Sequence, residues 1–223
     1  MATVLEAPAE DIRVRMDRMY RPQKHIYDLT RRYYLLGRDR LIEGLDARPG
    51  QTVLDIGCGT GRNLVRIGRR YPRTRLFGLD AAEPMLEAAA AKLRRAGVRA
   101  TLARGVAEAL DASTLFAHPA RFDHTTISYC LSMVDDPQAA VRAAIGHLAP
   151  GGTLHIVDFG DMARLPLWFQ GLVRAWLARF DVRHRPEVPL TLDAAARERG
   201  GRIHHGEIAG RYAALHRLRL PAA

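Results

Sequence analysis

Three glycines at alternate positions, Gly57, Gly59 and Gly61, follow the acid Asp55 and a short apolar run. Alternate glycines let the backbone turn sharply and leave room for a ligand against the main chain. The sixth position counted from Gly57 is Arg62, where the dinucleotide-binding fingerprint has glycine or alanine. The Gly-Lys-Ser/Thr of a phosphate-binding P-loop is also missing from this run. The pattern therefore predicts a loop that holds a small polar ligand.

A second acid, Asp80, ends the apolar run 75–80, at the distance from the glycine loop where a ribose-binding carboxylate is usual, about 20 residues. A carboxylate can accept two hydrogen bonds from a vicinal diol. An aspartate at a strand end can instead cap the next helix. Beside the glycine loop we favour ribose binding, and we expect Met85 to lie near the adenine.

The glycine loop resembles the first motif of class I S-adenosylmethionine-dependent methyltransferases, and the second acid supports this resemblance. The resemblance implies an α/β fold with a Rossmann-like, seven-stranded sheet and helices on both faces. It implies S-adenosylmethionine as cofactor, S-adenosylhomocysteine as product, and no metal. The implied cofactor-binding residues are Asp55, Gly57, Cys58, Gly59, Gly61, Asn63, Asp80, Met85, Val106 and Ser128.

Val106 departs from the pattern of that class. Many members carry an acid at this position, and it accepts a hydrogen bond from the adenine amino group. Valine cannot accept this bond, so backbone groups or Glu108 are the remaining candidates.

The N-terminal flank holds four of the seven tyrosines within residues 20–34. Apolar residues recur there at helical spacing, which marks a face packed on the core. The aromatic rings can simply be packing residues of an amphipathic helix. Alternatively, the segment is a lid whose phenol rings hold a sulfonium or quaternary ammonium by cation–π contact.

A second flank, residues 165–180, contains both tryptophans and a broad apolar face, with Gln170 and Arg174 on the polar side. A cationic helix with aromatic residues on its apolar side can lie in a lipid interface. An ordinary buried helix is the alternative. Residues 181–189 are predicted to form a loop.

Residues 19–180 resemble the diacylglycerylhomoserine N-methyltransferase of bacterial betaine-lipid synthesis. The resemblance rests on the tyrosine-rich segment 20–42, on Ser-Tyr-Cys-Leu-Ser-Met at 128–133, and on Val-Asp-Phe-Gly-Asp at 157–161 followed by Leu-Pro-Leu-Trp-Phe. It implies three successive methyl transfers to the amino group of a homoserine lipid at an anionic membrane surface. It also implies a functional partner, the 3-amino-3-carboxypropyl transferase that makes this lipid.

Methyl transfer to an amine needs a neutral nitrogen whose lone pair points at the methyl carbon, so a proton must leave first. The candidates for this catalytic role are Tyr27, Tyr129 and His25, although Tyr129 can equally pack in the core. Asp158 can be a cap or a substrate contact. The candidate substrate-binding residues are Tyr20, Arg31, Arg32, Tyr33 and Trp168. The two arginines could hold a carboxylate, or simply face solvent.

Alternating patterns predict strands at 53–56, 76–79, 98–103, 122–129 and 153–158, with helices at 61–71, 84–96 and 137–148. A turn is expected at 150–152 and a closing antiparallel hairpin at 202–218. Such alternation predicts a parallel sheet with ligands at the carboxyl ends of its strands. The predicted regions are a helical lid (1–45), a cofactor-binding core (46–160), a helical, membrane-facing insertion (161–200) and the hairpin (201–223).

The chain carries a formal net charge of +10, from 34 basic and 24 acidic residues, and the excess lies in the two flanks. Basic flanks attract an anionic surface. No apolar stretch approaches the roughly 20 residues of a membrane span, and no secretory signal is recognisable. Cys58 and Cys130 suggest neither a disulfide nor a metal site. We expect a cytoplasmic protein, peripheral at the inner membrane face.

Rival functions share the core motifs. A phospholipid (phosphatidylethanolamine) or small-amine N-methyltransferase is the main alternative. An RNA methyltransferase is disfavoured because the Asn/Asp-Pro-Pro-Tyr/Phe loop is missing where Ser128 and Tyr129 stand, and no nucleic-acid partner is expected. A non-catalytic partner subunit remains a third possibility, and the oligomeric state is open.

Overall fold

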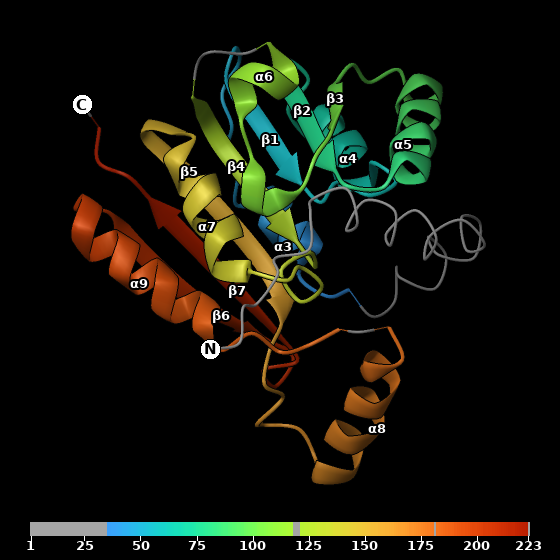
Figure 1. The fold of residues 1–223 in the computed structure, drawn as a ribbon, viewed down its shortest axis with the longest axis vertical. Coiled ribbons are helices and arrows are strands. Elements are labelled where there is room, and N and C mark those ends of the chain that lie inside the picture. Colours follow the sequence, from blue (N-terminus) through green and yellow to red (C-terminus); the bar gives the residue numbers. More distant parts are fainter. Residues whose placement is uncertain (1–34, 118–120, 181, 223) are drawn as a thin grey trace, which may run out of the picture.

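The computed structural model describes residues 35–117, 121–180 and 182–222. Seven strands form one sheet in the order β3-β2-β1-β4-β5-β7-β6 (Figure 1). β1 to β5 run parallel, and β7 is antiparallel to both of its neighbours. The strands are β1 (Thr52–Ile56), β2 (Arg75–Asp80), β3 (Thr101–Arg104), β4 (Phe122–Ser128), β5 (Leu148–Phe159), β6 (Arg202–Ile208) and β7 (Ala213–Arg219). This is the predicted Rossmann-like class I methyltransferase sheet.

Helices cover both faces of the sheet. Their bounds are α3 (Arg38–Glu43), α4 (Arg62–Arg70), α5 (Glu83–Ala96), the 3-10 turn η1 (Ala107–Ala109), α6 (Ala112–Phe116), α7 (Pro137–Gly146), α8 (Leu167–Ala178) and α9 (Glu187–Arg199). Residues of α6, α7 and α9 contribute to one hydrophobic core, and residues of α3, α4, α5 and α8 contribute to a second. Met85 of α5 forms a small third cluster with Ala82.

The central strand shows why the sequence folds this way. Every residue of β1 is buried, because a parallel strand in the middle of the sheet has helices above and below it. One face is anchored by edge-to-face contacts of Phe77 with Phe116 and Phe122, at ring-centroid distances of 5.5 and 5.3 Å. Such pairs add about 0.5–1.5 kcal/mol each beyond their buried area.

The predicted strands and helices exist with small shifts of their ends, and the hairpin closes the sheet beside β5 as expected. Two expectations were wrong. The predicted turn at 150–152 lies inside β5, where the register against β4 shifts. The predicted loop 181–189 ends early, because α9 begins at Glu187. The short helix α6, capped by the Asp111 side chain, was not predicted.

The helix after β5, α8, projects beyond the carboxyl ends of the strands (Figure 1). None of the described helices combines the length and apolar character that crossing a bilayer requires. Most of the predicted lid, with the candidates Tyr20, His25, Tyr27, Arg31, Arg32 and Tyr33, lies outside the described residues. The division of the chain into four regions remains a prediction.

Candidate active site

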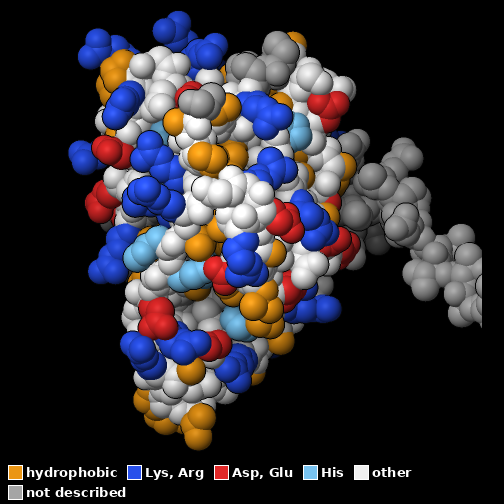
Figure 2. Space-filling view, turned by 90° about the vertical axis from the view of Figure 1, so that its left-hand side faces the viewer, with side chains coloured by type: hydrophobic (Ala, Val, Ile, Leu, Met, Phe, Trp, Pro, Cys, Tyr) orange, Lys and Arg blue, Asp and Glu red, His pale blue; other side chains and the backbone are white. Residues whose placement is uncertain are grey.

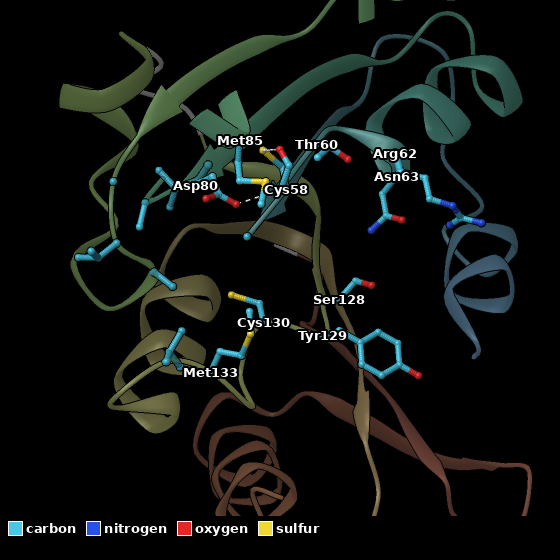
Figure 3. A pocket seen from close by; sticks show the side chains of 18 of the residues that line it. Cys58, Thr60, Arg62, Asn63, Asp80, Met85, Ser128, Tyr129, Cys130 and Met133 are labelled. Atoms are coloured by element: carbon cyan, nitrogen blue, oxygen red, sulfur yellow. Dashed lines mark hydrogen bonds between the residues drawn. The ribbon is translucent and has the colours of Figure 1, made fainter. Parts of the chain in front are cut away.

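An open cavity lies at the carboxyl ends of the parallel strands (Figure 3). Eight of the ten predicted cofactor-binding residues line it, together with Tyr129: Gly57, Cys58, Gly59, Asn63, Asp80, Met85, Val106 and Ser128. Figure 3 shows Asp80 and Met85 on one side of the open space and Asn63 on the other. The sheet topology therefore brings together residues that are far apart in the chain.

The three glycines of the loop have different roles. A Cβ atom added to Gly59, whose φ is +53°, would meet nothing within 4 Å. A Cβ on Gly57 would lie 2.4 Å from Cys130 Sγ, and a Cβ on Gly61 would lie 3.0 Å from Ala89 on α5. Gly61 is not part of the cavity wall; it allows α4 to pack closely on α5. The expected bare main chain facing a ligand is therefore found at Gly59.

Two backbone amides hold the carboxylate of Asp80 beside the glycine loop. Its Oδ2 accepts a hydrogen bond from the Gly59 amide at 2.7 Å, and its Oδ1 accepts one from the Ala82 amide at 3.0 Å. Ala82 precedes the first turn of α5, so the side chain stabilises that helix start and also faces the cavity. A carboxylate oxygen can accept more than one bond, which leaves it capable of binding sugar hydroxyls.

We expect Asp80→Asn to weaken binding of S-adenosylhomocysteine about fivefold, because a bond to an ionised acceptor is worth roughly 1 kcal/mol more than a neutral one. Asparagine keeps a carbonyl oxygen that can accept the Ala82 amide, so the helix start is preserved. Titration calorimetry measures the affinity, and thermal unfolding checks the fold. Unchanged affinity would remove Asp80 from the binding site.

Asp55 does not line the cavity but lies beneath it, fully buried. Its Oδ1 accepts a hydrogen bond from Thr126 Oγ1 at 2.6 Å. Burial raises the pKa of Asp55 to about 6, and the side chains of Thr126, Asn63 and Arg38 oppose this rise. The predicted cofactor contact is thus corrected to a supporting position under the loop.

The buried polar atoms of the cavity wall include two oxygens that have no partner among the described residues. They are Asn63 Oδ1 at the start of α4 and Ser128 Oγ at the end of β4. Buried polar atoms normally find a partner. Their position beside the open face at Gly59 fits a ligand with a polar tail, such as the amino acid part of S-adenosylmethionine.

The wall after β3 is apolar at Val106, which is buried. Glu108, two residues further on in η1, also lines the cavity. Glu108 therefore lies on the cavity wall, and it stays a predicted acceptor for an adenine amino group, one of the two options that the sequence left open.

Tyr129 is not placed to act as a base. Its hydroxyl donates a hydrogen bond to the Leu36 carbonyl at 2.6 Å, and its ring contacts Phe159 edge-on with centroids 4.7 Å apart. Burial raises the pKa of this phenol far above its usual value. Its φ of +54° is unusual for a non-glycine residue. The geometry fits an anchor for residues 35–36 and corrects the expected catalytic role.

The structure adds residues that the sequence did not single out. Leu35 and Arg38 reach the cavity from the N-terminal side, because Gly37 turns the chain with φ +83° into α3. The positive φ of Gly37 is a conformation that other residues rarely adopt, and a Cβ there would also lie 2.2 Å from Ile208 Cδ1, so glycine is strongly favoured. The sequence did not indicate this contact, because Leu-Gly-Arg by itself matches no binding motif.

The structure also places the two cysteines and Trp168, for which the sequence gave expectations. Cys58 and Cys130 line the cavity as free thiols, and burial raises the pKa of both. Trp168 lies on α8, 73% exposed, and does not line the cavity. Among the described residues, no group of three side chains could hold a metal ion.

The fold and the cavity define a class I methyltransferase architecture. Residues 53–152 match the family described as methyltransferase domain. The chain is 34% identical over 130 residues to a ubiquinone/menaquinone biosynthesis C-methyltransferase of Ruegeria sp., covering 56% of this chain and 49% of that protein. It is 31% identical over 141 residues to an uncharacterized methyltransferase of Mycobacterium bovis, covering 63% and 66%. The chain thus spans about half of the length of the first relative and 66% of the length of the second.

Solved structures show the same fold. The S-adenosylmethionine-dependent methyltransferase SibL superposes with a TM-score of 0.66 at 20% identity, covering 88% of this chain and 58% of that one. The plantazolicin methyltransferase BpumL, solved with S-adenosylhomocysteine, gives a TM-score of 0.66 at 13% identity, covering 96% and 98%. Residues 53–152 thus correspond to a methyltransferase domain, on a fold that the solved S-adenosylmethionine-dependent methyltransferases share.

Proposed function

We propose that this protein transfers methyl groups from S-adenosylmethionine to the amino head group of a membrane lipid, diacylglycerylhomoserine, in three successive steps. The observation that carries the lipid part is the exposed apolar surface of α8. Leu167, Trp168 and Leu172 are 82%, 73% and 63% exposed. Hydrophobic side chains gather at the lower end of the molecule in Figure 2, where α8 lies in Figure 1.

The helix α8 also lies near the cavity at the carboxyl ends of the parallel strands, which we call the donor cavity. A small cavity between them is lined by Trp176, Leu177 and Phe180 on one side and by Tyr129 and Met133 on the other. Tyr129 and Met133 also line the donor cavity. The small cavity has a volume of only about 20 Å³, so the head group of a lipid held at α8 would have to displace these side chains on its route toward the methyl donor.

The aromatic character of this route suits an amine that becomes cationic. Tyr129, Phe159, Trp176 and Phe180 surround the small cavity, and aromatic faces stabilise a cation by about 0.5–2 kcal/mol. Bound S-adenosylmethionine supplies an electrophilic methyl group on a sulfonium. The chain's own part is to orient and dehydrate the amine, and the proton-accepting candidates Tyr27 and His25 remain predictions.

The choice of head group rests on the sequence resemblance, which covers the tyrosine-rich segment and the run at 128–133. A second candidate acceptor is the ring carbon of a membrane quinone precursor, because the chain is 34% identical to a ubiquinone/menaquinone C-methyltransferase. Both acceptors are lipids, so the exposed surface of α8 serves either. A phosphatidylethanolamine acceptor fits the same surface.

Product mass separates these candidates. The purified protein is incubated with deuterated-methyl S-adenosylmethionine and vesicles that carry the homoserine lipid, phosphatidylethanolamine or a demethylated quinol. We expect one, two and three labelled methyl groups on the homoserine lipid only. A labelled quinol would identify a C-methyltransferase instead, and no product with any of the lipids would contradict the proposal.

The role of α8 is tested on the same vesicles. We expect a variant with Leu167→Gln, Trp168→Gln and Leu172→Gln to raise the lipid concentration needed for half-maximal rate by about tenfold or more, because buried apolar area drives interfacial binding. Leu190→Gln is the matched control, since Leu190 is 68% exposed but lies on α9. Equal loss in both variants would contradict a specific membrane-binding role of α8.

A further inference from the structure

A second cavity lies at the opposite end of the sheet, with a volume of about 400 Å³, within the usual range of ligand pockets. Its walls come from the amino-terminal parts of β4, β5 and β6, the end of β7 and the loop after α3. The donor cavity and α8 lie at the carboxyl ends of β4 and β5, so the two sites are separate.

The cavity wall is unusually rich in basic side chains. Four arginines and three histidines line it, against two aspartates: Arg48, Arg202, Arg217, Arg219, His124, His155, His204, Asp46 and Asp123. Asp123 accepts hydrogen bonds from the Thr52 amide and hydroxyl, both at 2.8 Å. Among the described residues, the recorded salt bridges include none of the four arginines.

The strand register forces these basic groups together. Arg202 on β6 stands directly opposite Arg219 on β7. Arg217 stands between His204 on β6 and His155 on β5. Like charges directly opposite each other in a sheet are destabilising. Of the two aspartates in the wall, Asp123 is already hydrogen-bonded to Thr52, so an anion bound between the strands would reduce the repulsion between the arginines.

A buried imidazole supplies a second, independent observation. His155 is 4% exposed, lines this cavity, and its Nε2 has no partner among the described residues. Burial, with His124 and Arg217 close by, lowers the pKa of His155 to about 3. The ring is therefore neutral, and in the tautomer with a proton on Nε2 it can donate one hydrogen bond to a ligand without its own charge.

We propose that this cavity binds a small, soluble anion that carries phosphate groups, at a site separate from methyl transfer. Arginine guanidinium groups suit phosphate because their planar donors bind its oxygens in pairs. Several such groups converge here from two adjacent strands. A lipid head group is a poorer occupant, because α8 and its apolar surface follow the opposite end of β5.

The test uses the full chain and sodium pyrophosphate at constant ionic strength, measured by titration calorimetry. We expect saturable binding that weakens tenfold or more in Arg217→Gln and in Arg219→Gln, and several-fold in His155→Phe. Arg95→Gln is the matched control, because Arg95 is exposed on α5 and its loss changes the net charge equally. Binding of S-adenosylhomocysteine should stay unchanged in all four variants, which also reports on their folding.

Three results would overturn the proposal. The first is no binding of pyrophosphate to the wild-type chain. The second is equal weakening in Arg95→Gln, which would indicate attraction by net charge alone. The third is tight, Arg217-dependent binding of a single-stranded oligonucleotide without binding of pyrophosphate, which would assign the surface to nucleic acid. Each result is independent of whether a lipid is methylated.

Discussion

Gly59→Ala should weaken binding of S-adenosylhomocysteine by between about tenfold and 100-fold. The added methyl group would occupy the open space in front of the loop, where nothing of the protein lies within 4 Å. Overfilling a packed site costs about 1–3 kcal/mol, and each 1.4 kcal/mol is a factor of ten in affinity. Titration calorimetry gives the affinity directly.

Gly97→Ala is a closely matched control for this substitution. Gly97 ends α5 with φ +65°, and a Cβ there also meets nothing within 4 Å. Both variants place alanine in a left-handed backbone conformation, so both should lose a similar stability, on the order of 1 kcal/mol. Only Gly59→Ala should lose affinity. Wild-type affinity in Gly59→Ala would show that the ligand does not approach this loop.

Asp55→Asn should become progressively more stable than wild type as the pH rises. The pKa of Asp55 is about 6 in the folded protein and 3.8 as the reference value for the unfolded chain. Because the folded state holds its proton more tightly, the wild-type carboxyl lowers the free energy of unfolding as pH rises through this window. From pH 4.5 to pH 7 the stability difference between variant and wild type should grow by about 2 kcal/mol.

Asp111→Asn should show the opposite dependence of stability on pH. Hydrogen bonds from Ser113 and Thr114 lower the pKa of Asp111 to about 2, so its ionised form stabilises the fold above the unfolded pKa. The wild type should therefore become more stable relative to Asp111→Asn as pH rises from about 2 to about 4, between the two pKa values. Urea unfolding measures the differences, with Asp55→Asn and wild type compared at pH 4.5 and pH 7, and Asp111→Asn and wild type compared at about pH 2.5 and about pH 4.5. If the difference in unfolding free energy between Asp55→Asn and wild type stayed constant with pH, the fold would not raise the pKa of Asp55.

The sequence predicted most of the sheet because its patterns are local. Glycine alternation after a buried apolar run, and a carboxylate at the next strand end, needed only neighbouring residues to be recognised. The hairpin around Gly210 followed from turn chemistry. By contrast, the N-terminal end of α9 was missed, because Pro186, which precedes it, provides no side-chain cap, and the apolar positions that mark α9 as a helix are buried only by the sheet and α7.

The roles of individual site residues depended on contacts between distant segments. Tyr129 was a candidate base because of its side-chain type. In the structure its hydroxyl donates a hydrogen bond to the carbonyl of Leu36, which lies 93 residues away in the chain. Asp55 belonged to the motif, yet its side chain points toward Thr126 beneath the loop. The basic cavity left no pattern in the chain, because its residues come from four strands and a loop.

By itself, the sequence determined the type of fold and predicted the cofactor loop and the class of reaction, since backbone freedom and strand patterning are properties of short segments. The tertiary structure decided which glycine leaves open space in the cavity, which acid lines the cavity and which polar groups lack partners. Register and packing set these outcomes, because a side chain's environment is fixed by neighbours that are remote in the chain and meet only when the sheet is assembled.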